Sequence, residues 1–240
     1  LPDSVTEIED CAFKECESLT SIKIPDGVTS IGWGVFEGCS SLTHVNLPDS
    51  VTEIGYGAFH DCKSLTKISL PDGVTEVGDY AFQACKSLTS IKIPDGVTSI
   101  GRGVFEDCSS LTHVNLPDSV TKIGWCTFRN CESLTKISLP DSVTEVGDYA
   151  FQVCKSLTSI KIPDGVTEVG SCAFHTCKSL TSIKIPDGVT SIGKYAFYGC
   201  PDDLVIYGYE SSYAETYAKA NGITFEVYDG KYKESVPKGK

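Results

Sequence analysis

Apolar and polar positions repeat along this chain with a period of 23 residues, from its first residues to about position 200. Each repeat has three segments. In residues 65–70 apolar and polar side chains alternate, which predicts a half-buried strand. A Pro-Asp-Gly or Pro-Asp-Ser turn follows, and then a second short extended piece that carries Val74 and Val77. In residues 79–87 the apolar side chains have the spacing of one helical turn with a single buried face.

The same residue types recur at the same phase of every repeat. Nine cysteines keep the period from Cys16 to Cys200, nine phenylalanines keep it from Phe13 to Phe197, and nine of the eleven prolines keep it as well. A fixed period of this length predicts a solenoid. No repeat can bury its apolar side chains alone, so the coils stack, and nine coils about 4.8 Å apart give a body roughly 40 Å long.

Both ends of the array depart from the repeat. The first coil begins at Leu1, in the last strand position, so it is truncated, and upstream coils or another segment are expected to cover its edge. After the last coil, Ser212 with Glu215 fits a capping box for a short helix, which lies between apolar strand segments at 204–207 and 223–228. The predicted division is a solenoid at 1–200, a C-terminal helix–strand cap at 201–228 and a flexible polar tail at 229–240.

A longer repeat overlies the short one. Residues 24–92 and 93–161 differ at eleven of 69 aligned positions, for example at Tyr56, which aligns with Trp125. Blocks of three coils have therefore been duplicated. A residue that recurs between the two blocks is inherited, so its recurrence is not independent evidence of function.

The pattern Leu-x-x-Ile-x-Ile/Leu-Pro-x-x-Val-x-x-Ile-Gly-x-x-Ala-Phe-x-x-Cys-x-Ser resembles the repeat of the BspA-like leucine-rich repeat family over about residues 1–200. The resemblance implies a right-handed curved solenoid, mainly β with short helical turns, whose Leu-x-x-Ile-x-Ile strands form a parallel sheet on the concave face. It also implies an extracellular or cell-surface protein of a host-associated bacterium, with a role in adhesion. The family has no shared active site, so no catalytic residue is carried over.

Composition narrows the function further. With 32 acidic and 20 basic residues the net charge is −12, which argues against a nucleic-acid partner. No apolar run approaches the roughly 18 residues of a membrane span, so no membrane insertion is expected in this segment. The sequence holds no Ser-His-acid set, no catalytic acid pair and no phosphate-binding loop. We therefore expect a monomeric, non-enzymatic protein without a cofactor.

The twelve cysteines are the first candidates for chemistry. There is no Cys-x-x-Cys pair, and the closest spacing is five residues. A column of reduced core thiols is therefore favoured, while disulfides and a metal site stay open as alternatives. Cys11, Cys126 and Cys172 share a variable position that elsewhere holds Gly or Tyr, and we expect them to be the most accessible thiols.

Carboxylates and imidazoles also recur. Nine aspartates follow the periodic prolines, from Asp3 to Asp187, and we expect each to cap its own turn, with a calcium-binding column as the alternative. His44 and His113 hold the same strand position three coils apart, at about 14 Å, so they cannot share a metal ion. No metal site is predicted.

The outward-facing strand positions form a mildly basic surface, here named the strip. Its two columns of eight residues hold six lysines, two histidines and no acid. On a strongly negative chain, this composition predicts a docking surface for an extended acidic partner, an extracellular protein or an acidic glycan of a host or neighbouring cell. The alternative is a row of solvated strand residues copied by duplication. The candidate contact residues are Lys23, His44, Asn46, Lys67, Lys92, His113, Asn115, Lys136, Lys161 and Lys184.

Three aromatic residues, Trp33, Tyr56 and Trp125, hold one repeat position that otherwise carries Asp, Arg, Ser or Lys. We expect their rings to be exposed. Exposed rings can anchor protein or sugar contacts, or they can simply pack on their neighbours.

These patterns favour a non-enzymatic, adhesion-type protein that binds a macromolecule with its concave face. The alternative function is a structural spacer, whose coils hold an attached catalytic or anchoring domain away from the cell. Near-identical coils favour the spacer, because a spacer needs length rather than a unique face.

Overall fold

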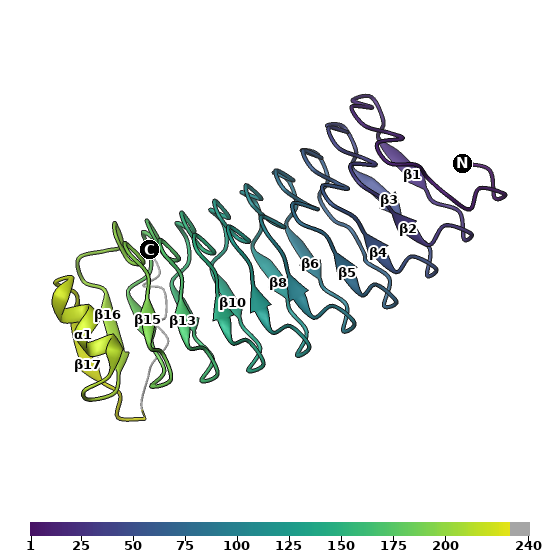
Figure 1. The fold of residues 1–240 in the computed structure, drawn as a ribbon. Coiled ribbons are helices and arrows are strands. Elements are labelled where there is room, and N and C mark those ends of the chain that lie inside the picture. The colour runs from purple at the N-terminus through teal and green to yellow at the C-terminus, as the bar shows by residue number, and fades with distance from the viewer. Residues whose placement is uncertain (231–240) are drawn as a thin grey trace.

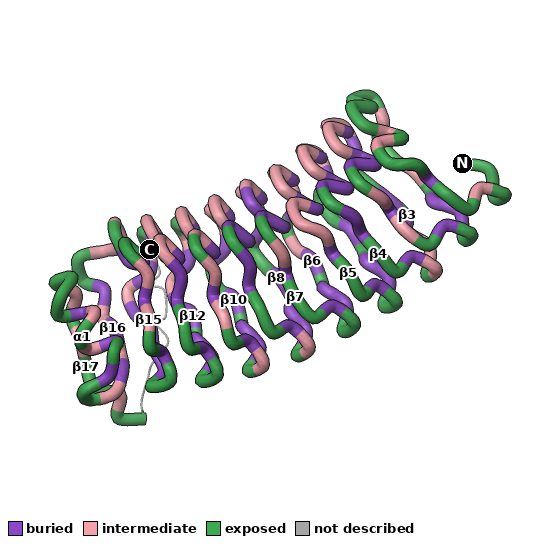
Figure 2. The backbone as a smooth tube through the Cα atoms, viewed as in Figure 1, coloured by how far each residue is buried: buried purple, intermediate pink, exposed green. Residues whose placement is uncertain are grey.

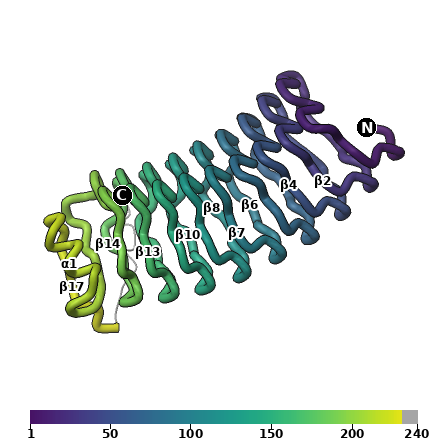
Figure 3. Tube along the Cα trace, viewed as in Figure 1, coloured from purple at the N-terminus to yellow at the C-terminus, as the bar shows by residue number. Residues whose placement is uncertain are grey.

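The computed structural model describes residues 1–230, and over that range it is one elongated stack of coils with a single helix at the C-terminal end (Figure 1). The coils lie side by side in sequence order, as the continuous colour gradient along the stack shows (Figure 3). All strand pairs are parallel, which confirms the predicted solenoid. Of the predicted tail at 229–240, residues 231–240 lie outside the described residues.

The first strands of the coils form a row of parallel strands, here named the strand face, which in residues 1–230 consists of two two-stranded sheets and one five-stranded sheet. Neighbouring strands pair with a shift of one repeat, as in Ile22 with Val45. Their middle residues are buried or half-buried, which is the alternation that the sequence predicts. In the third coil the pairing is reduced to a bridge between Lys67 and Ser90. The strands are β1 (Ser21–Lys23), β3 (His44–Asn46), β6 (Ser90–Lys92), β8 (His113–Asn115), β10 (Lys136–Ser138), β12 (Ser159–Lys161) and β14 (Ser182–Lys184).

A second row of parallel strands, here named the second face, is built from the two-residue strands that follow the Pro-Asp turns, and in residues 1–230 it consists of a three-stranded and a five-stranded sheet. In each of them a buried Ile or Val follows an exposed or half-buried residue, and a glycine comes next in the sequence. The strands are β2 (Ser30–Ile31), β4 (Glu53–Ile54), β5 (Glu76–Val77), β7 (Ser99–Ile100), β9 (Lys122–Ile123), β11 (Glu145–Val146), β13 (Glu168–Val169) and β15 (Ser191–Ile192).

The third segment of each coil consists of hydrogen-bonded turns in place of the helical turn that the spacing suggests. Two residues per coil have a left-handed backbone, as at Tyr80 and Ala84, where φ is +59°. Because the chain reverses at these residues, the amides of Tyr80, Phe82 and Ala84 all donate to carbonyls of the next coil. A left-handed residue other than glycine costs about 1–2 kcal/mol, and the hydrogen bonds between coils offset this cost.

The core is one hydrophobic cluster that runs through the stack. Buried residues recur at corresponding places in the coils after the first (Figure 2, purple). The phenylalanine rings from Phe13 to Phe197 stack with centroids 5.3–5.8 Å apart. Beside them the buried thiol of Cys62 donates to the carbonyl of Phe36 in the preceding coil, and this contact is repeated along the thiol column. Each coil is therefore completed only by its neighbours.

A helix and two strands close the C-terminal end. Helix α1 (Tyr213–Ala220) begins after Ser212, whose Oγ accepts the N–H of Glu215, and the Glu215 carboxylate accepts the N–H of Ser211. These two bonds confirm the helix start that the sequence predicts. The strands β16 (Val205–Gly208) and β17 (Thr224–Val227) extend the strand face beyond β14 in parallel register.

Candidate binding surfaces

The register of the strand face places the strip in two neighbouring columns. Most of its side chains are exposed, so the strip is a continuous polar surface along the stack. One column contains Ser21, His44, Lys67, Ser90, His113, Lys136, Ser159 and Ser182. The other contains Lys23, Asn46, Ser69, Lys92, Asn115, Ser138, Lys161 and Lys184.

Three lysines of the strip reach back to the aspartate in the turn of the preceding coil. The sequence suggested that each aspartate caps its own turn. In the first 230 residues the turns are instead closed by a valine amide that donates to the proline carbonyl. An exposed ion pair adds only about 0–1 kcal/mol to stability, but it reduces the positive field of the strip. The pairs are Lys92–Asp72 (3.5 Å), Lys161–Asp141 (3.1 Å) and Lys184–Asp164 (3.5 Å).

The C-terminal end of the strip is covered. Lys184 is only 9% exposed, and its Nζ lies 4.4 Å from the ring centroid of Tyr228 and 5.9 Å from that of Tyr209. Ser159 and Ser182 are buried as well. Lys184 is therefore engaged by the cap and does not face solvent, contrary to the sequence prediction. The open part of the strip lies on the N-terminal side of this residue.

A hollow of about 350 Å³ lies on the strip, where the pairing of the third coil is reduced. Its floor is apolar, from Ile68, Leu70 and Ile91, and no acid is among the residues that line it. Hydrogen-bond donors surround this floor, so the hollow suits a partner that presents acceptors or negative charge. The polar residues around it are Lys67, Ser69, Ser90, Lys92, His113 and Asn115.

The three candidate aromatic residues lie on the second face. Their rings are exposed, as predicted: 50% for Trp33, 52% for Tyr56 and 39% for Trp125. The ring of Tyr56 meets Tyr80 edge-on at 5.5 Å, and Trp125 meets Tyr149 in the same way at 6.0 Å. The hollows that Tyr56 and Trp125 line share no residue with the hollow on the strip. The rings and the strip therefore belong to different sites.

The thiol column is buried from Cys39 to Cys177, and burial raises the pKa of Cys39 to about 11. Cys126 is fully buried, so the prediction that it is one of the most accessible thiols is wrong. Its side chain packs beside the ion pair of Glu106 and Arg129, which covers it. Cys16, in the first coil, is the exposed thiol of the described residues.

Glu106 is a buried acid that the sequence did not single out. Its two carboxylate oxygens accept from Gln83 Nε2 at 2.8 Å and from Arg129 Nη1 at 3.0 Å. Burial raises its pKa, and the charge of Arg129 opposes that rise. Because both oxygens are occupied by residues of adjacent coils, Glu106 acts as a link between three coils. The signal in the sequence is a polar residue at this phase of every coil except the last, where it is Tyr198.

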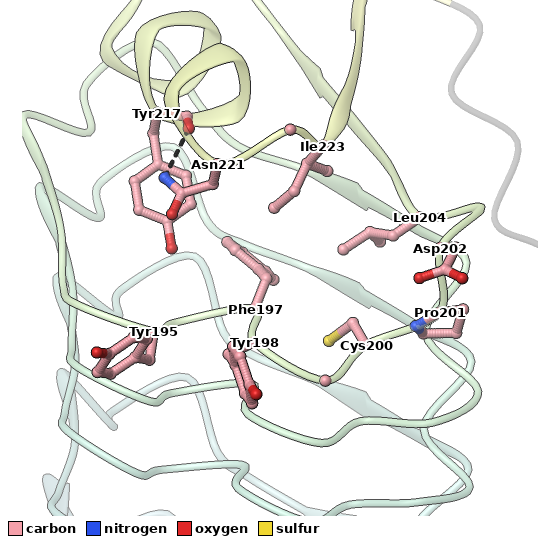
Figure 4. A pocket seen from close by; sticks show the side chains of 12 residues that line it. Tyr195, Phe197, Tyr198, Cys200, Pro201, Asp202, Leu204, Tyr217, Asn221 and Ile223 are labelled. Carbon is pink, nitrogen blue, oxygen red and sulfur yellow. Dashed lines mark hydrogen bonds between the residues drawn. The ribbon is translucent and has the colours of Figure 1, made fainter.

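A further hollow lies between the last coil and α1 (Figure 4). The ring of Tyr217 lies edge-on to Phe197 at 6.0 Å, so it ends the phenylalanine stack. Burial raises the pKa of Tyr217, and hydrogen bonds with the backbone of Phe197 and Ala196 oppose that rise. Asn221 donates to the carbonyl of Tyr217 at 2.8 Å. The contacts of Tyr217 beside this hollow thus fix the C-terminal cap to the last coil.

Among residues 1–230 no three His, Cys, Asp or Glu side chains gather as metal ligands would. None of the helical segments in the described part of the chain has the length and apolar character to cross a membrane.

Comparison with known proteins identifies the repeat. The sequence profile of the BspA type leucine rich repeat region matches residues 1–111 and 75–203. None of the curated proteins matches the sequence.

Several solved structures are similar in fold. A leucine rich cell surface protein from Faecalibacterium prausnitzii is 28% identical with a TM-score of 0.51, over 96% of this chain and 87% of that one. A leucine-rich repeat protein of T. pallidum is 29% identical with a TM-score of 0.52, over 86% and 85% of the two chains. The pneumococcal vaccine antigen PcpA is 18% identical with a TM-score of 0.57, over 88% and 68%, and this likeness concerns the fold alone.

Proposed function

Because this chain belongs to the BspA type leucine-rich repeat family, we propose that it is a non-enzymatic, adhesion-type binding protein that acts outside the cell or at its surface. The cell-surface description of the F. prausnitzii protein supports this location. In this proposal the strip docks an extended acidic segment of a protein or a glycan. The partner belongs to a host or a neighbouring cell.

One observation carries the proposal: the hollow on the strip brings Lys67, Lys92 and His113 together over an apolar floor without an acid. Among the ion pairs within residues 1–230, Lys92 is the only one of the three with a partner. That partner, Asp72, is 93% exposed and can be displaced by a ligand carboxylate or sulfate. The negative body of the chain repels acidic partners elsewhere, so the strip is also the surface that can orient them.

The test is solid-phase binding of two acidic probes, heparin and poly-glutamate, at low and at physiological salt. The Lys67→Ala/Lys92→Ala variant is expected to bind at least ten-fold more weakly than the wild type. The matched control is Lys86→Ala/Lys178→Ala, which removes the same charge from two exposed lysines outside the strip. An equal loss in both variants, or unchanged binding in the first, would discard the strip.

The spacer function is the second candidate, because the two three-coil blocks carry the strip without a single difference between them. A spacer requires only a stiff rod of fixed length. It is favoured if neither acidic probe binds at low salt while small-angle scattering shows an elongated, rigid particle.

A further inference from the structure

A groove runs along the second face above the column of glycines, and the proposed function does not use it. Two open hollows, of about 550 Å³ and about 400 Å³, share Asp79, Ser99 and Gly101, so they form one continuous surface. We name it the glycine groove. Its floor is formed by Gly55, Gly78, Gly101, Gly124, Gly147 and Gly170.

The floor of the groove stays bare because the coils stack too closely there for any side chain. A Cβ atom at Gly78 would lie 2.6 Å from the amide nitrogen of Tyr56, and one at Gly124 would lie 2.7 Å from the carbonyl carbon of Gly101. Real Cβ atoms do not approach backbone this closely. The close stacking of the coils therefore excludes side chains from this column, whose glycines are buried or half-buried.

Charged side chains form one edge of the groove. They are the outward residues of the second-face strands, and most of them are acidic. Lys122 is the exception, and its Nζ lies 2.9 Å from Oε1 of Glu145. On the opposite edge Asp79 and Asp148 each use one carboxylate oxygen to accept a main-chain N–H of the next coil. Within residues 1–230, Glu53, Glu76 and Glu168 of the first edge form no ion pair and remain for a ligand, whereas Glu145 is paired with Lys122.

Two aromatic rings stand on the opposite edge. Tyr56 and Trp125 lie three coils apart, about 14 Å, and both rings are held in place by the edge-on contacts with Tyr80 and Tyr149. Tyr80 and Tyr149 are themselves fixed by left-handed backbone, with φ of +59° at each. The two rings are therefore exposed and preorganised, which lowers the entropic cost of binding.

The duplication gives an internal comparison of this position. Trp33 aligns with Arg102 of the second block, whereas Tyr56 aligns with Trp125. The phase of Tyr56 therefore holds an exposed ring in both blocks, while Arg102, at the same repeat phase one coil before Trp125, places a cation on this edge of the groove.

We propose that the glycine groove binds a neutral polysaccharide along the axis of the solenoid. Tyr56 and Trp125 stack on the apolar faces of two sugar rings, and Glu53, Glu76 and Glu168 accept hydrogen bonds from hydroxyl groups. The aliphatic residues beneath the groove, such as Ile100, are buried, so they offer little apolar surface to a peptide side chain. The excess of acids on both edges repels an acidic glycan, so the groove and the strip select different ligands.

The test is native affinity electrophoresis through gels that contain a soluble mixed-linkage β-glucan, xylan or galactomannan. Retardation by at least one of these polysaccharides is expected, with weak dependence on salt. The Tyr56→Ala/Trp125→Ala variant should lose it, with a dissociation constant at least ten-fold higher. Because both rings are exposed, the variant should keep its far-UV circular dichroism and its unfolding midpoint.

Two controls separate this site from other surfaces. Tyr198→Ala removes a ring outside the groove that is 65% exposed, more than either groove ring, and this variant should bind as the wild type does. The strip variant Lys67→Ala/Lys92→Ala should be retarded as the wild type is. Polysaccharide binding by the groove can therefore be observed even if the strip binds no acidic partner. No retardation by any of the three polysaccharides, equal loss in Tyr198→Ala, or salt-sensitive binding of poly-lysine alone would overturn the neutral-glycan site.

Discussion

A phenylalanine in each coil lies flat against the phenylalanine of the next, and this stack runs through the core from Phe13 to Phe197. Phe105 is fully buried between Phe82 and Phe128, at 5.8 Å and 5.6 Å. We expect Phe105→Ala to lower the free energy of unfolding by about 3–5 kcal/mol, because a buried ring is replaced by a cavity. Urea denaturation followed by circular dichroism measures the loss.

The matched variant is Phe13→Ala in the first coil. Phe13 is half-buried and has one stacking partner, Phe36, so its removal should cost less than half as much. Equal losses at Phe13 and Phe105 would contradict the idea that stacking on both sides stabilises each ring.

The reactivity of the cysteine thiols can be predicted at the scale of residues as well. Only the thiolate reacts with an alkylating reagent, and burial raises the pKa of Cys39, Cys126 and Cys200 to about 11. We expect iodoacetamide at pH 8 to label Cys16 first and Cys11 next in the native protein. Mass spectrometry of tryptic peptides identifies the sites. Labelling of Cys126 at the rate of Cys16 would show that its cover of Glu106 and Arg129 opens readily.

Individual residues mark the limit of what the sequence could predict. The period placed Phe105 and Cys108 in the core, because burial follows from recurrence at one phase. Cys11, Cys126 and Cys172 share a left-handed backbone, which the glycines at the same phase of other coils could have indicated. Only Cys126 is fully buried, because the pair of Glu106 and Arg129 lies beside it, and this contact between coils cannot be read from a single repeat.

At the scale of elements, the glycines after the second-face strands set how closely the coils approach. A Cβ at Gly124 would meet the carbonyl carbon of Gly101 at 2.7 Å and the carbonyl oxygen of Ile100 at 2.9 Å. We expect Gly124→Ala to lower the free energy of unfolding by about 1–3 kcal/mol, as an overpacked core does. Thermal unfolding monitored by circular dichroism provides the measurement.

Gly73→Ala is the control for this effect. A Cβ at Gly73 would lie no closer than 3.5 Å to any neighbour, and the duplicated block holds Ser142 at the same phase. This variant should unfold within about 0.5 kcal/mol of the wild type, which is the usual range for surface substitutions. If both variants lost stability alike, a general intolerance of alanine at glycine positions would explain the result better than close stacking.

The elements also show why the candidate sites were harder to predict than the fold. Alternation of side chains is a local property, so the strands of the strand face could be read from six residues at a time. The charge of the strip is reduced by ion pairs such as the one between Lys92 and Asp72 of the preceding coil. These two residues are 20 positions apart, which differs from the 23-residue period, so the repeat alone does not predict the pair. The glycine groove likewise follows from how glycine backbones stack, which becomes visible only when neighbouring coils are in contact.

At the scale of the whole molecule, each coil depends only on its neighbours, so the array should tolerate the loss of complete repeats. Deleting residues 24–92 removes one three-coil block and joins Lys23 to Ile93, the residue that follows Lys92 in the intact chain. We expect this shortened protein to fold cooperatively, with far-UV circular dichroism per residue unchanged. Its urea m-value should fall by roughly a third, because m scales with the surface that unfolding exposes.

The control deletion breaks the phase. Removing residues 24–84 instead joins Lys23 to Cys85, so a strand residue is followed directly by the end of a turn segment. The phenylalanine, cysteine and glycine columns would then be interrupted at the junction, and this variant should lose cooperative unfolding or split into two transitions. If the deletion of 24–92 behaved as badly as the deletion of 24–84, contacts between distant coils would have to stabilise the molecule, and stacking of nearest neighbours would not be sufficient.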